Sequence, residues 1–123
     1  MDQTELVTAG RAAGHALVER LKGTGFPVTA AFWFWEEELR EESLVIVTPL
    51  ANESSREAYT RIAAVLQQHP EIAPLYFLAR TRVVSPALLR EWLARGSGPF
   101  GGTRADIRFP WIEGERADPW PAH

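Results

Sequence analysis

The sequence predicts a single α/β domain of the order α-β-β-α-β-α-β, in which helices pack on a mixed sheet of three or four strands. Three observations predict this class. Stretches with apolar residues at helical spacing alternate along the chain with runs of β-branched and aromatic residues. The chain has 123 residues, which is the length of one ordinary domain. A strand, a helix and a second strand follow one another in mid-chain, which is typical of a parallel crossover.

The first helix and two strands are predicted from spacing. Residues 4–22 carry apolar or small side chains on one helical face, and Gly23 is expected to end the helix in the left-handed conformation. Residues 26–36 have two apolar faces, which is typical of a central strand covered on both sides or of a strand whose second face is an interface. Residues 44–50 form a β-branched run, and the short connection before it predicts an antiparallel hairpin.

The later elements are predicted in the same way. A helix is expected over residues 53–68, with Asn52 or Ser54 as its N-cap. Residues 74–84 are expected to form one strand along their whole length. A third helix begins at Pro86 and ends at Arg95, where Gly96 follows.

The end of the chain completes the predicted organisation. Residues 96–103 are expected to form a mobile connection, and residues 107–112 a last short strand. The domain is therefore expected to cover residues 1–112, and residues 113–123 to form a turn and a loose tail. No apolar run is long enough to span a membrane, and the first residues lack the features of a signal peptide. We expect a cytoplasmic protein without contact to membranes.

Short motifs in the same order resemble a group of small bacterial α/β proteins. They are residues 25–33 (GFPVTAAFW), 44–50 (LVIVTPL), 56–59 (REAY) and 83–86 (VVSP). The glycine-rich connection and residues 107–109 are also similar, so that the resemblance covers roughly residues 10–110. It supports the predicted order of elements, and it implies no activity because none is established for that group.

Charge is distributed unevenly along the chain. Residues 1–72 contain six basic and eleven acidic residues, whereas residues 73–112 contain six basic and two acidic ones. The densest acidic cluster lies at the expected hairpin turn and consists of Glu36, Glu37, Glu38, Glu41 and Glu42. A solvated loop is the simplest interpretation. The alternative is a docking site for a basic partner, or for the arginine-rich half of a second copy.

Two arginines in the basic half are candidates for binding. Arg80 and Arg82 are two residues apart in the expected third strand, so their side chains are expected to leave the same face. Two neighbouring guanidinium groups can hold a phosphate or a carboxylate. This favours a nucleic acid or a phosphorylated ligand as an alternative partner, although the acidic pI of about 5.6 and the single lysine count against it.

The aromatic run from Phe32 to Trp35 predicts a contact surface. Two large aromatic side chains on each face are more than a small sheet with a thin cover of helices readily hides. Trp33 and Trp35 are therefore expected to contribute to self-association.

Signatures of catalysis and of metal binding are missing from the sequence. There is no cysteine, and the three histidines, His15, His69 and His123, form no metal-ligand pattern. The glycine-rich connection lacks the strand and helix that a phosphate-binding loop needs around it. We therefore expect no cofactor, no metal and no catalytic residue. The sequence favours a non-catalytic interaction module that self-associates or joins a complex, with Trp33, Trp35, Arg80 and Arg82 as contact residues.

Overall fold

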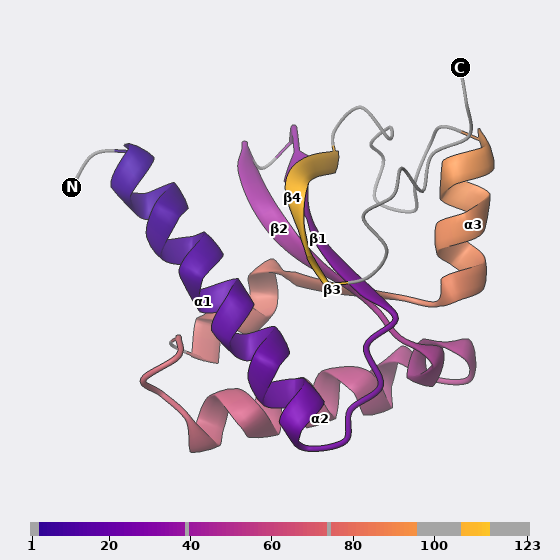
Figure 1. Ribbon diagram of the computed structural model, residues 1–123, viewed down its shortest axis with the longest axis horizontal. Helices are drawn as coiled ribbons and strands as arrows, with labels where there is room; N and C mark the ends of the chain where they lie inside the picture. Colours follow the sequence, from indigo (N-terminus) through magenta and orange to yellow (C-terminus); the bar gives the residue numbers. More distant parts are fainter. Residues whose placement is uncertain (1–2, 39, 74, 96–106, 114–123) are drawn as a thin grey trace.

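A computed structural model describes residues 3–38, 40–73, 75–95 and 107–113 (Figure 1). The elements are α1 (Gln3–Gly23), β1 (Ala30–Glu36), β2 (Glu41–Val47), the 3-10 helix η1 (Pro49–Asn52), α2 (Ser55–Gln68), the 3-10 helix η2 (Leu75–Arg80), β3 (Thr81–Val84), α3 (Pro86–Arg95) and β4 (Ile107–Glu113). The predicted α/β class and the predicted order of helices and strands are confirmed.

The four strands form one mixed sheet with the order β3-β2-β1-β4. β1 is antiparallel to both of its neighbours, and β2 and β3 are parallel. The hairpin of β1 and β2 and the parallel crossover through α2 are therefore both as predicted. None of the helices in the described ranges is long and apolar enough to cross a membrane.

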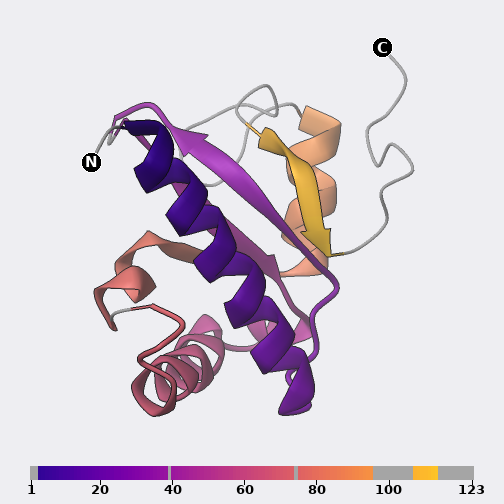
Figure 2. The ribbon, with the colours of Figure 1, turned by 60° about the vertical axis from the view of Figure 1, so that its left-hand side comes forward.

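Helices cover both faces of the sheet. α1 and α2 lie on one face and α3 lies on the other, so that in Figure 2 α1 is in front of the strands and α3 behind them. The alternation of β1 explains this arrangement, because Ala31 and Trp33 are buried with α1 and α2 while Phe32 and Phe34 are buried with α3. The prediction that both faces of this strand are covered is confirmed.

The strand expected over residues 74–84 is correct only at its end. η2 occupies Leu75–Arg80, and only Thr81–Val84 form β3. The Thr81 hydroxyl donates to the carbonyl of Phe77 at 3.1 Å, and Phe77 is buried in the core. Burial of Phe77 in this compact turn outweighs the preference of Leu, Tyr and Phe for strands, which is weak and depends on context.

Other local expectations are corrected at the ends of elements. The left-handed glycine after α1 is Gly25, with a φ of 84°, and not Gly23. Ser54 is the N-cap of α2, but its side chain makes no capping hydrogen bond. Strand β1 begins at Ala30, later than predicted, and β2 spans Glu41–Val47. The connection 96–103 and the tail after Glu113 lie outside the described residues.

Candidate interaction site at the hairpin end

The β1–β2 hairpin closes with a turn that contains a strained residue. The N–H of Arg40 donates to the carbonyl of Glu36 at 2.7 Å, and Arg40 has a φ of 54°. A residue with a Cβ atom rarely adopts this left-handed conformation, because the Cβ approaches the backbone too closely. Glu37, Glu38 and Arg40 are exposed in this turn.

Replacing Arg40 with glycine is expected to stabilise the protein. Glycine adopts a positive φ without strain, so we expect a gain of about 0.5–1 kcal/mol in the free energy of unfolding. Urea unfolding would measure this gain. Arg40→Ala is the matched control, because it removes the guanidinium and keeps the strain. An equal gain in both variants would show that charge, and not backbone strain, is responsible.

On the α3 face of the sheet, an ion pair connects the hairpin to β3. Arg82 donates from Nε and Nη2 to the two carboxylate oxygens of Glu36, at 3.2 and 2.9 Å. The hydroxyl of Ser43, which is fully buried in β2, donates to the same carboxylate. The Glu36 side chain is only 10% exposed and that of Arg82 is 29% exposed. Three strands are thus connected through one carboxylate.

On the α1 face, a second ion pair connects the hairpin to the helix. Arg11 of α1 donates from Nε and Nη2 to the two carboxylate oxygens of Glu42, at 3.1 and 2.8 Å. Arg80 donates from Nη2 to the backbone carbonyl of Glu42 at 2.8 Å, and its Nε lies 4.0 Å from Oε2 of Glu41. The pairs Arg82–Glu36 and Arg11–Glu42 are bidentate, and a bidentate pair restricts the orientation of the two groups as well as their distance. The end of the β1–β2 hairpin is therefore held on both faces of the sheet.

The two carboxylates also affect the protonation of their arginines. The hydrogen bonds that Arg11 donates to Glu42 and Arg82 donates to Glu36 raise the pKa of the two arginines, and burial opposes this rise more weakly. A group with a raised pKa stabilises the fold below its ordinary pKa, and the stabilisation is lost as the pH rises through the raised value. Both arginines are therefore charged at neutral and moderately alkaline pH.

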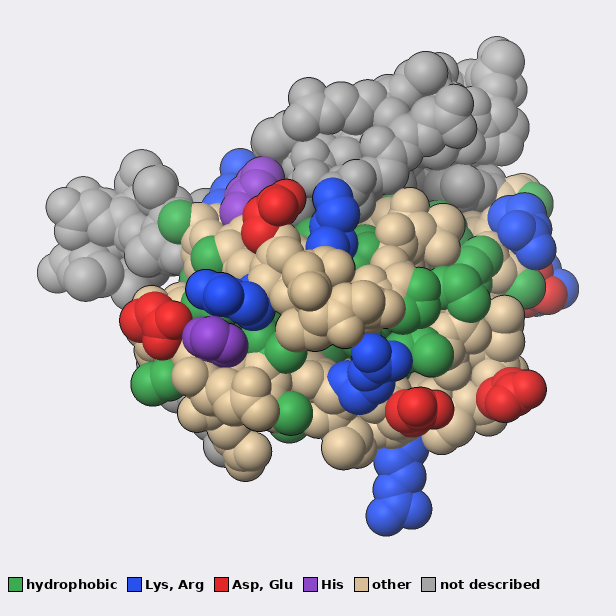
Figure 3. All heavy atoms as spheres, turned by 60° about the horizontal axis from the view of Figure 1, so that its bottom comes forward, with side chains coloured by type: hydrophobic (Ala, Val, Ile, Leu, Met, Phe, Trp, Pro, Cys, Tyr) green, Lys and Arg blue, Asp and Glu red, His purple; other side chains and the backbone are tan. Residues whose placement is uncertain are grey.

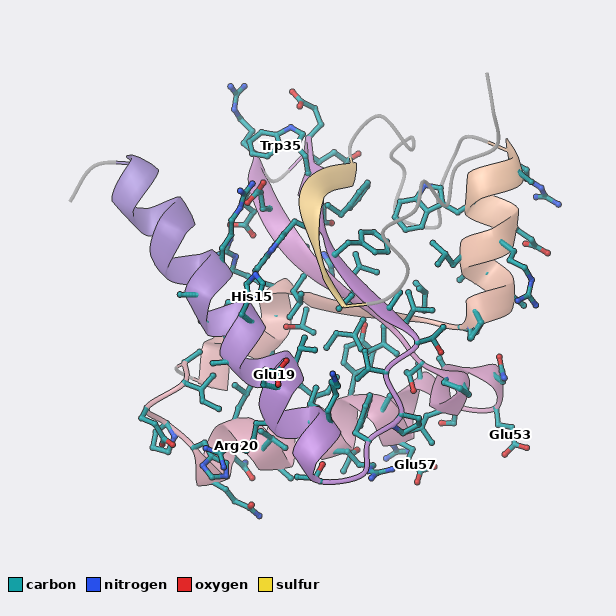
Figure 4. All side chains as sticks on the ribbon, in the orientation of Figure 1. His15, Glu19, Arg20, Trp35, Glu53 and Glu57 are labelled. Atoms are coloured by element: carbon teal, nitrogen blue, oxygen red, sulfur yellow. The ribbon has the colours of Figure 1, made fainter. Side chains whose placement is uncertain are left out.

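The two tryptophans of β1 lie in different environments. Trp33 is 2% exposed and belongs to the core, so the folded chain does not present it to a partner. Trp35 is partly exposed, and its Nε1 donates to Oε2 of Glu37 at 2.5 Å. Figure 4 shows Trp35 at the end of the hairpin, far from Glu53 and Glu57 at the other end of the sheet. We call Trp35, Glu37, Glu38 and Arg40 the hairpin end.

The structure also separates the arginines that the sequence places together. Arg80 is the last residue of η2 and Arg82 lies in β3, so the expected pair on one strand face is wrong. Arg80 approaches Gly10 of α1, whereas Arg82 binds Glu36 on the opposite face of the sheet. The change from 3-10 helix to strand between them turns their side chains apart.

Three carboxylates of the acidic cluster lie near arginines of the same chain. Glu36 pairs with Arg82, Glu42 pairs with Arg11, and Glu41 lies near Arg80. No pattern in the sequence singled out Arg11, Ser43 or Arg40. The acidic cluster in the first half of the chain and the arginines in the second half could have indicated ion pairs within the chain. Nothing in the sequence indicated the positive φ of Arg40. Whether any residue of the cluster contacts a partner stays a prediction.

The face at the bottom of Figure 1 carries a mixed set of charged side chains. In Figure 3, acidic, basic and histidine side chains are interspersed over the face that is at the bottom of Figure 1. His69 lies 3.2 Å from the Glu71 carboxylate, and His15 is exposed on α1. Within the described ranges, no three His, Cys, Asp or Glu residues are grouped so as to hold a metal ion.

Among known proteins, no family model, no curated protein and no solved structure matches the chain.

Proposed function

We propose that the protein is a non-catalytic interaction module that acts in the cytoplasm and contacts its partner through the hairpin end. One observation carries the proposal. Trp35 is the only member of the aromatic run from Phe32 to Trp35 that is not buried, and it lies near the end of β1, beside a turn whose flanking strands are held by ion pairs on both faces of the sheet. Tryptophan is enriched among the residues that contribute most to protein interfaces.

Rigidity supports this choice of surface. Association costs free energy when side chains and loops must become ordered, and a turn that is already ordered avoids part of that cost. The bond from Trp35 to Glu37 and the two-pronged pairs to Glu36 and Glu42 fix the turn before any partner binds.

The alternative, a binder of nucleic acid or phosphorylated ligands, has less support. It would use the guanidinium groups of Arg80 and Arg82. Arg82 already donates to both oxygens of Glu36, and Arg80 donates to the carbonyl of Glu42. A phosphate would have to displace these acceptors and would also meet the negative charge of Glu36 and Glu41.

Site-specific cross-linking in cells of the source organism tests the proposed function. A photoreactive amino acid at position 38 is expected to form protein adducts, whereas the same group at Glu53, which is exposed at the other end of the sheet, is expected to form none (Figure 4). Trp35→Ser should remove the adducts formed from position 38. Equal adducts from both positions, or none from position 38, would contradict a contact through the hairpin end.

A further inference from the structure

The charges that remain at the hairpin end are of both signs. Glu36 and Glu42 pair with Arg82 and Arg11, and Arg80 lies near Glu41. The exposed side chains of the acidic cluster are then those of Glu37 and Glu38 in the turn and that of Glu41, which is 41% exposed. Arg40 is exposed in the same turn, and among the described residues it has no carboxylate within ion-pair distance. The surface is therefore not simply acidic, as the sequence suggested, but carries both charges within four residues.

We infer that the partner of the hairpin end is the hairpin end of a second copy, in a two-fold symmetric contact where Arg40 of each copy faces Glu37 and Glu38 of the other. This inference rests on the proposed function and names its partner. A two-fold contact uses the same patch twice, so the patch must be complementary to itself. One cation and two carboxylates beside a partly exposed indole meet this requirement, whereas a patch of one sign would repel its copy.

The backbone of Arg40 gives a second, independent argument. Its φ of 54° is costly for any residue except glycine. Among the described residues, its side chain makes no hydrogen bond or ion pair that offsets this cost. Arg40 is exposed in the turn, so in the symmetric contact its guanidinium can reach the carboxylates of the partner copy.

The size of the hairpin end limits the strength of the contact. A stable dimer buries about 800 Å² on each partner, and an aromatic side chain supplies about 150–250 Å². One tryptophan and three turn residues fall short of a stable interface. We therefore expect a weak dimer that exchanges rapidly, with a dissociation constant on the order of 10–100 μM.

Charge exchange in the purified full-length chain tests this inference. Sedimentation velocity over a concentration series should show dimers of the unmodified chain. Arg40→Glu makes the turn wholly acidic, and Glu38→Arg makes it predominantly basic while keeping the bond between Glu37 and Trp35. Each variant alone should dimerise at least about tenfold more weakly, since like charges then face one another across the two-fold axis. An equimolar mixture of the two variants should recover dimers.

Two controls distinguish this contact from a general effect of charge and from misfolding. Arg90→Glu changes a charge on the exposed face of α3 and should leave dimerisation unchanged. Circular dichroism should show that every variant is folded. A chain that remains monomeric, an Arg40→Glu variant that dimerises like the unmodified chain, or a mixture that remains monomeric would each overturn the inference.

The outcomes for the proposed function are distinct from these. Adducts from position 38 to a different protein, together with a monomeric purified chain, would support the interaction module and overturn the symmetric contact. Adducts with the mass of two chains would support both the interaction module and the symmetric contact, provided that Arg40→Glu alone forms none. The two charge variants together should form them again.

Discussion

Trp92→Ala is expected to lower the free energy of unfolding by about 3–5 kcal/mol, the typical cost of replacing a large buried aromatic residue with alanine. Trp92 is 1% exposed and packs against two rings of β1. Its ring lies 5.9 Å from Phe32, tilted by 59°, and 5.1 Å from Phe34 in an edge-on arrangement at 84°. The variant loses both ring contacts and leaves a cavity between α3 and the sheet.

The effect should be large because, among the side chains that the structure describes, few attach α3 to the sheet. In the second core cluster, the other α3 residues that pack against the sheet are Leu88 and Leu89, and both are only partly buried. Chemical unfolding monitored by circular dichroism would measure the loss of stability.

Trp92→Phe keeps an aromatic ring and should lose less stability than Trp92→Ala. It therefore keeps the prediction measurable if the alanine variant does not fold. Arg95→Ala, at an exposed position of the same helix, should change stability by no more than about 0.5 kcal/mol. A loss below about 1 kcal/mol in Trp92→Ala would contradict this account.

Arg82→Met is expected to lower the free energy of unfolding by about 2–3 kcal/mol. Removing one member of a fully buried ion pair costs roughly 3–5 kcal/mol, because a charge is left behind without its partner. The expected cost is smaller here because Arg82 is partly exposed, and the Ser43 hydroxyl remains as a donor to Glu36. Unfolding in urea at neutral pH measures the change.

A double-mutant cycle separates the pair from the packing of its side chains. Glu36→Leu combined with Arg82→Met removes both charges, so the double variant should be more stable than Arg82→Met alone and within about 1 kcal/mol of the unmodified chain. Arg90→Met on α3 serves as the control for loss of an exposed arginine and should change stability little. If the two single changes simply add, Glu36 and Arg82 do not act as a pair.

Much of the fold was predictable from local patterns. The spacing of apolar residues indicated the three α-helices, and the two apolar faces of residues 26–36 predicted a strand that is either covered on both sides or has an interface on its second face; the structure shows the first. These predictions succeed because the repeat of a helix or a strand and the burial of one or two faces leave a direct trace in the sequence.

The conformation of residues 75–80 was not predictable in this way. Leu75, Tyr76 and Phe77 favour a strand, yet they lie in a 3-10 helix, where the chain advances about 2.0 Å per residue and not the roughly 3.3 Å of a strand. Which conformation these residues adopt depends on where Phe77 finds its place in the core, and local preference does not specify that place.

The candidate site depended still more on the tertiary structure. The composition showed an acidic hairpin and a basic second half, and these suggested partners outside the chain. Arg11, Arg80 and Arg82 come from α1, η2 and β3, and folding brings all three to the end of one hairpin. Ion pairs between residues 31 to 46 positions apart leave no periodic trace in the sequence.

The sequence by itself therefore determined the fold class, the order of the elements and the burial of β1 on both faces, because these follow from hydrophobic periodicity and from residues that end helices. The tertiary structure alone decided which charges of the hairpin remain exposed and which tryptophan of β1 is partly exposed. Both depend on which distant elements meet, since a carboxylate beside an arginine is neutralised and an indole beneath a helix is buried, whatever their neighbours along the chain.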